Sequence, residues 1–333
     1  MTKKRWAEID VLYTIGTLLV ILGHSHSSDW GSFHGTFLDP LLVFIYAFHM
    51  PLFFFIAGFL FQNSFALERD GYGKWLGNKA LRLLTPYIVL SVATLIPKYY
   101  FEHSGFAGFT LHYLLQVLFI PRIGVWGHFW FLPVLLLVYA VFGLWKPLYR
   151  GKYTPAVAAM SVVAALTLYF LPFSTQWIGF EDFKTSVIFF LTGVLIRSMP
   201  EHFNLTRVSP VSCIAAVACV GMTIIALRRW EGLAAAKLLV AFMMIYFCWE
   251  LAVFIGDRFV CRWLSKHSFT VYTYSWPFQA MMMTICGRFS FPWYLTTIYM
   301  FLTGLCAPIL LILLYEKTCK KPHRFLELVL GVK

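Results

Sequence analysis

Charge is scarce in this sequence. Only 13% of its 333 residues are Asp, Glu, Lys or Arg, and just 15 of them are acidic, whereas 60% are hydrophobic. An ordinary soluble domain carries about 25% charged residues, because its surface must be wetted by water. So little charge excludes that class and predicts a polytopic membrane protein.

The common catalytic and nucleotide-binding motifs are also missing. The sequence contains no GxGxxG, Walker lysine motif, HExxH or GxSxG, which argues against the enzyme classes built on them. Its seven cysteines form no CxxC pair. We expect them to be small buried hydrophobic residues rather than a disulfide framework or a zinc site, and we expect neither a metal nor a permanently bound cofactor.

Long apolar runs dominate what is present. Only helices and closed barrels satisfy their backbones in lipid, and continuous runs are typical of helices. The stretch 106–121 is ambiguous: it predicts an interfacial or re-entrant helix, and a full span there would change the topology. The fold class predicted is an all-α, polytopic membrane protein with one domain over residues 1–333 and about ten transmembrane helices. The ten runs are 8–27, 40–62, 83–100, 129–146, 154–172, 184–199, 209–227, 234–256, 268–286 and 293–315.

The distribution of basic residues predicts the orientation. With ten spans and a cytoplasmic N-terminus, 20 of the 27 Lys and Arg residues fall in inner segments, which leaves seven outside. Cytoplasmic loops carry such an excess of basic residues, so both termini are predicted to be cytoplasmic. Contact of these loops with anionic lipid accounts for most of the net charge of +12, and no nucleic-acid partner is needed.

Two consecutive apolar runs each carry a histidine, His24 and His49. Ionisable groups are costly inside a membrane and are functional candidates there. Helical geometry puts Tyr13 on nearly the same face as His24 and Asp10 within about 40° of that face. The alternatives are that Asp10 caps the helix start, that His24 is hydrated at the interface, and that His49 is an internal hydrogen-bonded residue.

Basic and aromatic residues supply further candidates. Lys79 and Arg82 precede an apolar run on the predicted cytoplasmic side, where Arg suits bidentate phosphate binding. His128 lies between Trp126 and Trp130, in either an aromatic belt at the membrane interface or a surface that stacks on a sugar. The segment SFTVYTYSWPFQ, residues 268–279, carries many hydroxyl groups, including those of Tyr272 and Ser275, and is predicted to face a polar interior.

Five segments together resemble the membrane-bound acyltransferase 3 family, and most closely its branch of fucose-acetylase-like and exopolysaccharide O-acetyltransferases. In chain order they are IDVLYTIGTLLVILGH, FHMPLFFFIAGFLF, KALRLLTPY, HFWFLP and SFTVYTYSWPFQ. The resemblance implies a multi-pass protein of the bacterial inner (cytoplasmic) membrane. It would transfer an acyl group, usually acetyl, from cytoplasmic acyl-CoA to a hydroxyl of a cell-envelope polysaccharide or its lipid-linked sugar precursor.

The sequence departs from the family pattern at two positions. The family has a basic residue, then ten residues, then a histidine in the first helix. His24 matches the histidine, but Tyr13 occupies the basic position. The missing charge near the donor would then come from Arg5, Lys79 or Arg82. Ser275 stands where the family often has a histidine.

The chemistry predicts His24 as the general base, because a neutral imidazole accepts a proton near pH 7. His26, Asp29 or His49 would orient it. Asp10 is about 21 Å away along the helix and would organise the cytoplasmic mouth. An oxyanion donor would come from Tyr272, Tyr274 or Ser275, and His26, His128 and Trp130 would contact the acceptor.

Other functions fit part of the pattern. A transporter or flippase for a glycan or lipid would also use polar stripes and kinked helices, although we find no internal repeat. The other superfamily of membrane O-acyltransferases uses an intramembrane histidine, but fits the five ordered segments poorly. Tyr13 and Ser275 also leave open an inactive partner protein.

Overall fold

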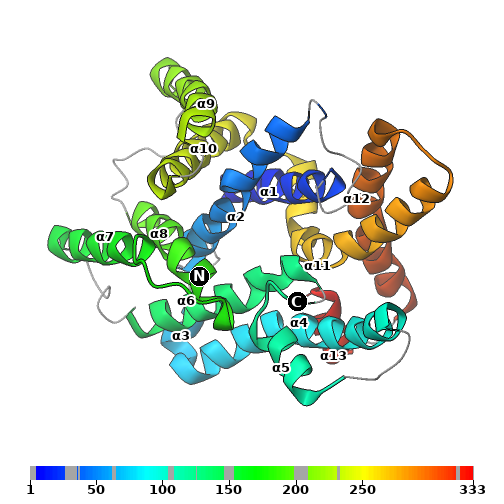
Figure 1. Ribbon diagram of the computed structural model, residues 1–333. Coiled ribbons are helices and arrows are strands. Elements are labelled where there is room, and N and C mark those ends of the chain that lie inside the picture. Colours follow the sequence, from blue (N-terminus) through cyan, green and yellow to red (C-terminus); the bar gives the residue numbers. More distant parts are fainter. Residues whose placement is uncertain are drawn as a thin grey trace. The chain divides into compact units, whose positions relative to one another are not determined.

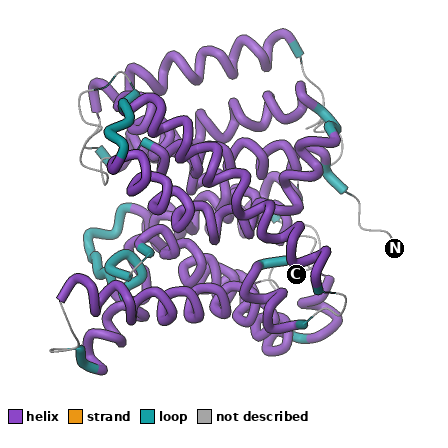
Figure 2. Tube along the Cα trace, turned by 90° about the vertical axis from the view of Figure 1, so that its right-hand side faces the viewer, coloured by secondary structure: helices purple, strands orange, loops and turns teal. Residues whose placement is uncertain are grey.

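The computed structural model describes residues 5–26, 36, 38–61, 65–103, 109–124, 126–145, 154–198, 209–230, 233–319 and 323–332. Within those ranges every regular element is a helix (Figure 2). The predicted all-α class is therefore confirmed for the described part of the chain. Asp29 lies outside it.

The longer helices are α1 (Ala7–Ser25), α2 (Asp39–Phe61), α4 (Tyr72–His103), α6 (Phe131–Trp145), α7 (Pro155–Tyr169), α8 (Phe180–Arg197), α9 (Pro210–Trp230), α10 (Ala234–Ile255), α11 (Phe259–Arg288) and α12 (Trp293–Thr318) (Figure 1). The short ones are α3 (Phe65–Asp70), α5 (Leu111–Phe119), η2 (Gly127–Trp130), η4 (Trp177–Gly179) and α13 (Arg324–Leu330).

Each of the ten predicted spans coincides with one of the longer helices. Among the residues that the structure describes, six segments are long and apolar enough to cross a membrane: α1, α2, most of α4, η2 with α6, α10 and α12. Helix α7 and most of α9 are apolar but shorter, so the crossing of all ten stays a prediction. Helix α5 has nine residues, about 13 Å at 1.5 Å per residue, which is too short for a span.

Two helices begin earlier than their apolar runs. Helix α4 starts at Tyr72 rather than at residue 83, and α11 starts at Phe259 rather than at residue 268. Arg82 therefore lies inside α4, immediately before the apolar run that was predicted from residue 83. A hydropathy run marks where a helix is apolar, whereas Lys, Leu, Ala and Arg continue a helix beyond that run.

The seven cysteines are all free. Cys248 and Cys286 are buried, as predicted, but Cys213, Cys306 and Cys319 are exposed, so burial was wrong for these three. An apolar run predicts a helix without showing which of its faces turns toward the other helices.

The chain folds into two compact units. Unit 1 contains residues 1–56, 199–321 and 332, and unit 2 contains residues 57–198, 322–331 and 333. Helix α2 contributes residues to both. The prediction of a single domain stays a prediction.

In unit 1, helix α1 packs against α10, α11 and α12 (Figure 1). Ile21, Leu264, Val271 and Ile309 form one of its buried clusters. Because α1 is apolar on nearly all sides, it is suited to such a surrounded position. The side chain of Phe53 on α2 fills the space beside Gly16, where a Cβ atom would lie 2.8 Å from the Phe53 ring.

In unit 2, the end of α2 and helices α4, α6 and α8 contribute side chains to an aromatic core, and α7 packs against α8. The aromatic core consists of Phe61, Trp75, Tyr139, Phe142 and Phe190, whose contacting ring centroids lie between 4.6 and 6.3 Å apart. Gly58 lies against the backbone of Phe190: a Cβ atom there would come 1.9 Å from the Phe190 carbonyl oxygen.

Candidate active site

The two candidate histidines, His24 on α1 and His49 on α2, both contact Tyr46. His24 is half-buried in the last turn of α1. The Tyr46 ring stands edge-on to it, with centroids 6.5 Å apart, and edge-on to His49 at 5.3 Å. The Tyr46 hydroxyl donates a hydrogen bond of 3.1 Å to the Gly23 carbonyl. Tyr46 therefore joins the His24 end of α1 to the His49 region of α2.

His49 is held in a defined orientation. Its side chain is 5% exposed, and Nδ1 donates a hydrogen bond of 2.9 Å to the Ile45 carbonyl. In a neutral imidazole this bond leaves the lone pair on Nε2. Pro51, two residues later, lies inside α2 and removes one N–H from the helix. His49 thus presents one acceptor nitrogen from a locally weakened helix.

A buried polar seam joins α1 to α11. Gln279 is fully buried, and its Nε2 donates to the Ile21 carbonyl at 2.9 Å and to the Ser25 hydroxyl at 2.8 Å. The Gln279 Oε1 atom and the hydroxyl of Ser275, which is 1% exposed, make no hydrogen bond to any residue that the structure describes. Two buried polar atoms of α11 are thus left for other partners, and one of them belongs to Gln279, which contacts the last turn of α1.

His26 is a buried bridge rather than an exposed binding residue. It is 1% exposed. Its Nδ1 lies 2.9 Å from the Thr297 hydroxyl on α12, and its Nε2 lies 2.7 Å from the Thr36 hydroxyl, which donates to Asp39 at the start of α2. The ring also stands edge-on to Trp293. His26 therefore ties the end of α1 to α2 and α12, and its predicted acceptor contact stays a proposal.

The stability of unit 1 should depend on the protonation of His26, which lies one residue beyond the apolar segment Ala7–Ser25. Burial lowers the pKa of His26 below 6.5, and the Asp39 carboxylate opposes the shift. Because the folded state takes up this proton less readily than the unfolded state, stability should be constant above about pH 6.5 and fall below it. Thermal unfolding in nanodiscs from pH 7.5 to 5 measures this.

Two variants test whether His26 causes the loss of stability below pH 6.5. His26→Asn should lose about 2 kcal/mol at neutral pH through unsatisfied hydrogen bonds and should flatten the decline below pH 6.5. His112→Asn, at an exposed position of α5, is the matched control and should unfold as wild type does. An equally steep decline in His26→Asn would show that another group causes it.

The opposite end of α1 carries an ion pair. Arg5 donates a hydrogen bond to the Asp10 carboxylate. The Thr14 hydroxyl lies 2.9 Å from the Asp10 carbonyl and 3.1 Å from the Cys261 carbonyl of α11. Tyr13 packs near Phe53, with ring centroids 6.2 Å apart. Arg5 and Asp10 thus form a polar end to α1, one turn from Tyr13.

Lys79 and Arg82 lie on α4 in unit 2. The Lys79 ammonium lies 4.5 Å from the centroid of the Tyr139 ring, over its face, and Lys79 is half-buried. Such a cation–π contact is stronger where water is excluded. Arg82, one turn later, is exposed. Lys79 therefore lies against Tyr139 of the aromatic core, while Arg82 is the more exposed of the two.

The segment Trp126 to Trp130 forms part of unit 2. Trp126 is 8% exposed, stacks on Phe129 and donates to the Thr94 hydroxyl. The ring centroids of His128 and Trp126 lie 5.9 Å apart. Trp130 is half-buried, and the Arg122 Cζ atom lies over its ring, 4.5 Å from the centroid. Trp126 and Phe129 are thus buried, whereas Trp130 is half-buried and Arg122, which precedes this segment, is exposed.

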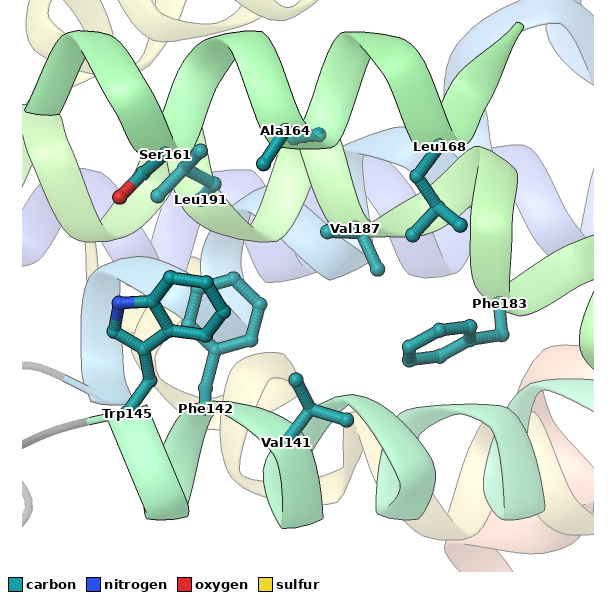
Figure 3. Close-up of a pocket in the computed structure, with 10 residues that line it drawn as sticks. Val141, Phe142, Trp145, Ser161, Ala164, Leu168, Phe183, Val187 and Leu191 are labelled. Atoms are coloured by element: carbon teal, nitrogen blue, oxygen red, sulfur yellow. The ribbon is translucent and has the colours of Figure 1, made fainter. Parts of the chain in front are cut away.

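A small cavity of about 100 Å³ lies between α6, α7 and α8 in unit 2 (Figure 3). Its lining is apolar, with Phe142, Trp145, Leu168, Phe183 and Leu191 around it. The one hydroxyl, that of Ser161, donates to the Val157 carbonyl. Ligand sites usually measure 300–1,000 Å³, so this cavity is too small for a CoA molecule. None of the predicted site residues lines it.

Residues 6–316 match the family model described as an acyltransferase domain. The chain belongs to the acyltransferase 3 family. No curated protein and no solved structure matches it. As a family member with several helices apolar enough to span, it is a multi-pass membrane protein and an acyltransferase in the general sense. This agrees with the family suggested by the five sequence segments, whereas the particular branch stays a proposal.

In this acyltransferase, the sequence did not predict the contacts made by Tyr46, Arg122 and Asp182. Tyr46 lies three residues before His49, so one helical turn predicts contact between those two. Nothing local pairs Arg122 with Asp182, which is 60 residues away. Among the residues that the structure describes, no group of three His, Cys, Asp or Glu side chains is arranged to hold a metal ion.

Proposed function

We propose that this protein transfers an acyl group, most often acetyl, from cytoplasmic acyl-CoA to a hydroxyl of a cell-envelope glycan or its lipid-linked precursor. The observation that carries the proposal is the group of His24, Tyr46 and His49 in a chain that matches the acyltransferase model along nearly its whole length. We assign it to the fucose-acetylase-like and exopolysaccharide O-acetyltransferase branch, in a bacterial inner membrane with both termini cytoplasmic.

The proposed reaction needs one base and no metal. A ring nitrogen of neutral His24 takes the proton from the acceptor hydroxyl as its oxygen attacks the thioester carbonyl. The C–S bond then breaks and the His24 imidazolium returns the proton to the leaving CoA thiolate. Ser275 donates to the developing oxyanion, because its hydroxyl is buried without a hydrogen bond to a described residue; Tyr272, which is 8% exposed, is the second candidate.

Tyr46 and His49 support His24 in this proposal. The hydroxyl of Tyr46 is engaged with the Gly23 carbonyl, so Tyr46 positions the end of α1. His49 offers its Nε2 lone pair, and the Ile45 hydrogen bond fixes its ring. Both act as positioning residues for the base. Asp10 and Tyr13 belong to the predicted cytoplasmic end of α1.

The donor's phosphates require positive charge, and Tyr13 does not supply it. We propose Arg82 as the main phosphate ligand, since it is exposed and one turn from Lys79. Lys79 adds charge while it remains over the Tyr139 ring. Arg5 is a weaker candidate because it is paired with Asp10.

A comparison of two donors tests this function. Purified protein in nanodiscs should bind labelled acetyl-CoA and slowly release CoA. Arg82→Ala should raise the KM for acetyl-CoA about tenfold, the loss of one charge-assisted contact. The same change should leave the KM for S-acetyl-pantetheine unaltered, because that donor lacks the nucleotide phosphates.

Lys74→Ala is the matched control, since Lys74 lies on the same helix and is 70% exposed. It should keep the wild-type KM for both donors. If the wild-type protein binds no acyl-CoA, the proposal is wrong, and a transporter or an inactive partner protein becomes the better account. If Arg82→Ala affects both donors alike, Arg82 does not bind the phosphates.

A further inference from the structure

In unit 2, the guanidinium of Arg122 is held by Asp182 and by the ring of Trp130. Arg122 donates from Nε to both Asp182 oxygens, at 2.8 and 3.1 Å, and from Nη2 to Oδ1 at 2.5 Å. It also lies over the Trp130 ring. We call Arg122, Trp130 and Asp182 the Arg122 site. Such a bidentate pair fixes the orientation of the guanidinium plane.

One edge of Arg122 remains accessible. Its side chain is 53% exposed, whereas that of Asp182 is 10% exposed. Both Asp182 oxygens accept hydrogen bonds from Nε and Nη2, whereas Nη1 makes no hydrogen bond to any described residue. The site therefore presents rigid N–H donors next to a half-buried indole.

The surrounding charges cancel. Arg122 is neutralised by Asp182, and Lys184 lies 3.1 Å from the Glu181 carboxylate. Lys184 also donates to the carbonyls of Leu171 and Phe173. A site for phosphate or carboxylate keeps an excess of positive charge, whereas these four residues sum to zero. Electroneutral donors beside an aromatic ring suit an uncharged molecule that carries hydroxyl groups.

The backbone that supports the site adopts an unusual conformation. Ile178 and Gly179 are consecutive residues with positive φ, 57° and 71°. That region is costly for a β-branched residue and persists where the surroundings enforce it, often at functional sites. Gly179 lies so close to α6 that a Cβ atom would come 2.6 Å from Val134. This turn leads directly into α8, which begins two residues before Asp182.

We propose that the Arg122 site binds an uncharged sugar ring of the acceptor, with the Arg122 Nη1 donating to a sugar oxygen and Trp130 packing against the ring's C–H face. Asp182 holds the guanidinium in place and does not contact the sugar. The role as an acceptor site rests on the proposed acyltransferase function, whereas binding of the sugar does not.

Binding of simple glycosides without acyl-CoA tests this site. Saturation-transfer NMR would use the methyl glycosides of glucose, galactose and fucose, with methyl glucuronoside as the charged comparison. Nanodiscs are required, because maltoside detergents carry the same kind of sugar. At least one neutral glycoside should bind to the wild type, and Arg122→Gln should weaken it at least tenfold.

Two further variants separate recognition from folding. Arg69→Gln removes another bidentate Arg–Asp pair of unit 2, that with Asp70, and should bind glycosides as wild type does. The double variant Arg122→Asp with Asp182→Arg keeps an ion pair, so it should melt near the wild-type temperature and still fail to bind glycosides.

Several outcomes would overturn the proposal. They are no neutral glycoside bound by the folded wild type, equal binding by Arg122→Gln, full binding by the charge-swapped variant, or tighter Arg122-dependent binding of the glucuronoside. Glycoside binding by a protein that releases no CoA from acyl-CoA would refute the enzymatic function while leaving the sugar site intact.

Discussion

Replacing His24 by alanine should lower the rate of acyl transfer by about 10²- to 10⁴-fold, the usual contribution of a general base. The imidazole is the group proposed to accept the acceptor's proton, and alanine cannot replace it. His24 is only half-buried, so its removal should cost little stability. The measurement is release of CoA from labelled acetyl-CoA in nanodiscs, with the melting temperature followed in parallel.

Two histidine variants sharpen this result. His49→Ala should lose less activity than His24→Ala, because His49 is proposed only to position the base through Tyr46. His112→Ala, on the exposed side of α5, is the matched control and should keep full activity. A wild-type rate in folded His24→Ala would remove His24 from the mechanism, and a larger loss in His49→Ala would make His49 the base.

The substitution Gly58→Ala should destabilise unit 2 by about 3 kcal/mol, at the upper end of the usual cost of overpacking. The added Cβ would lie 1.9 Å from the Phe190 carbonyl oxygen and 2.7 Å from its carbonyl carbon. Both are backbone atoms, so no change of rotamer relieves the clash and the two backbones must separate. That separation would also disturb the contact of Phe61 with Phe190, whose centroids are 5.5 Å apart.

Gly77→Ala provides the matched control on α4. No atom lies within 4 Å of a Cβ atom at Gly77, so the same substitution should stabilise the helix by about 0.5–1 kcal/mol. Thermal unfolding of both variants in nanodiscs measures the difference. Equal melting temperatures would show that the close approach of Gly58 to Phe190 does not contribute to stability.

Periodicity and hydropathy predicted much of the fold. They located a helix in each of the ten predicted segments, because a helix of this kind follows from local composition. They missed the starts of α4 and α11, where polar residues extend a helix beyond its apolar part. Hydropathy measures transfer into lipid, whereas the helical backbone is determined by propensity and hydrogen bonding.

The candidate site was predicted less completely. His24 and His49 were candidates because they lie in consecutive apolar runs, and the structure brings both into contact with Tyr46. The hydrogen bonds that join His26 to Thr297 and Thr36 were not predicted, and its acceptor contact stays a proposal. The Arg122–Asp182 pair was not predicted. Each of these contacts depends on which distant segments meet, and a single sequence holds no local signal for that.

The packing of α1 against three other helices limits how this chain can change in length. Inserting or deleting one residue within α1 would rotate everything beyond that point by about 100°. His24 would turn away from Tyr46, while Gln279 would lose its partners Ile21 and Ser25. Relatives that retain this arrangement should therefore keep the spacing between Asp10 and His24 while their loops vary freely in length.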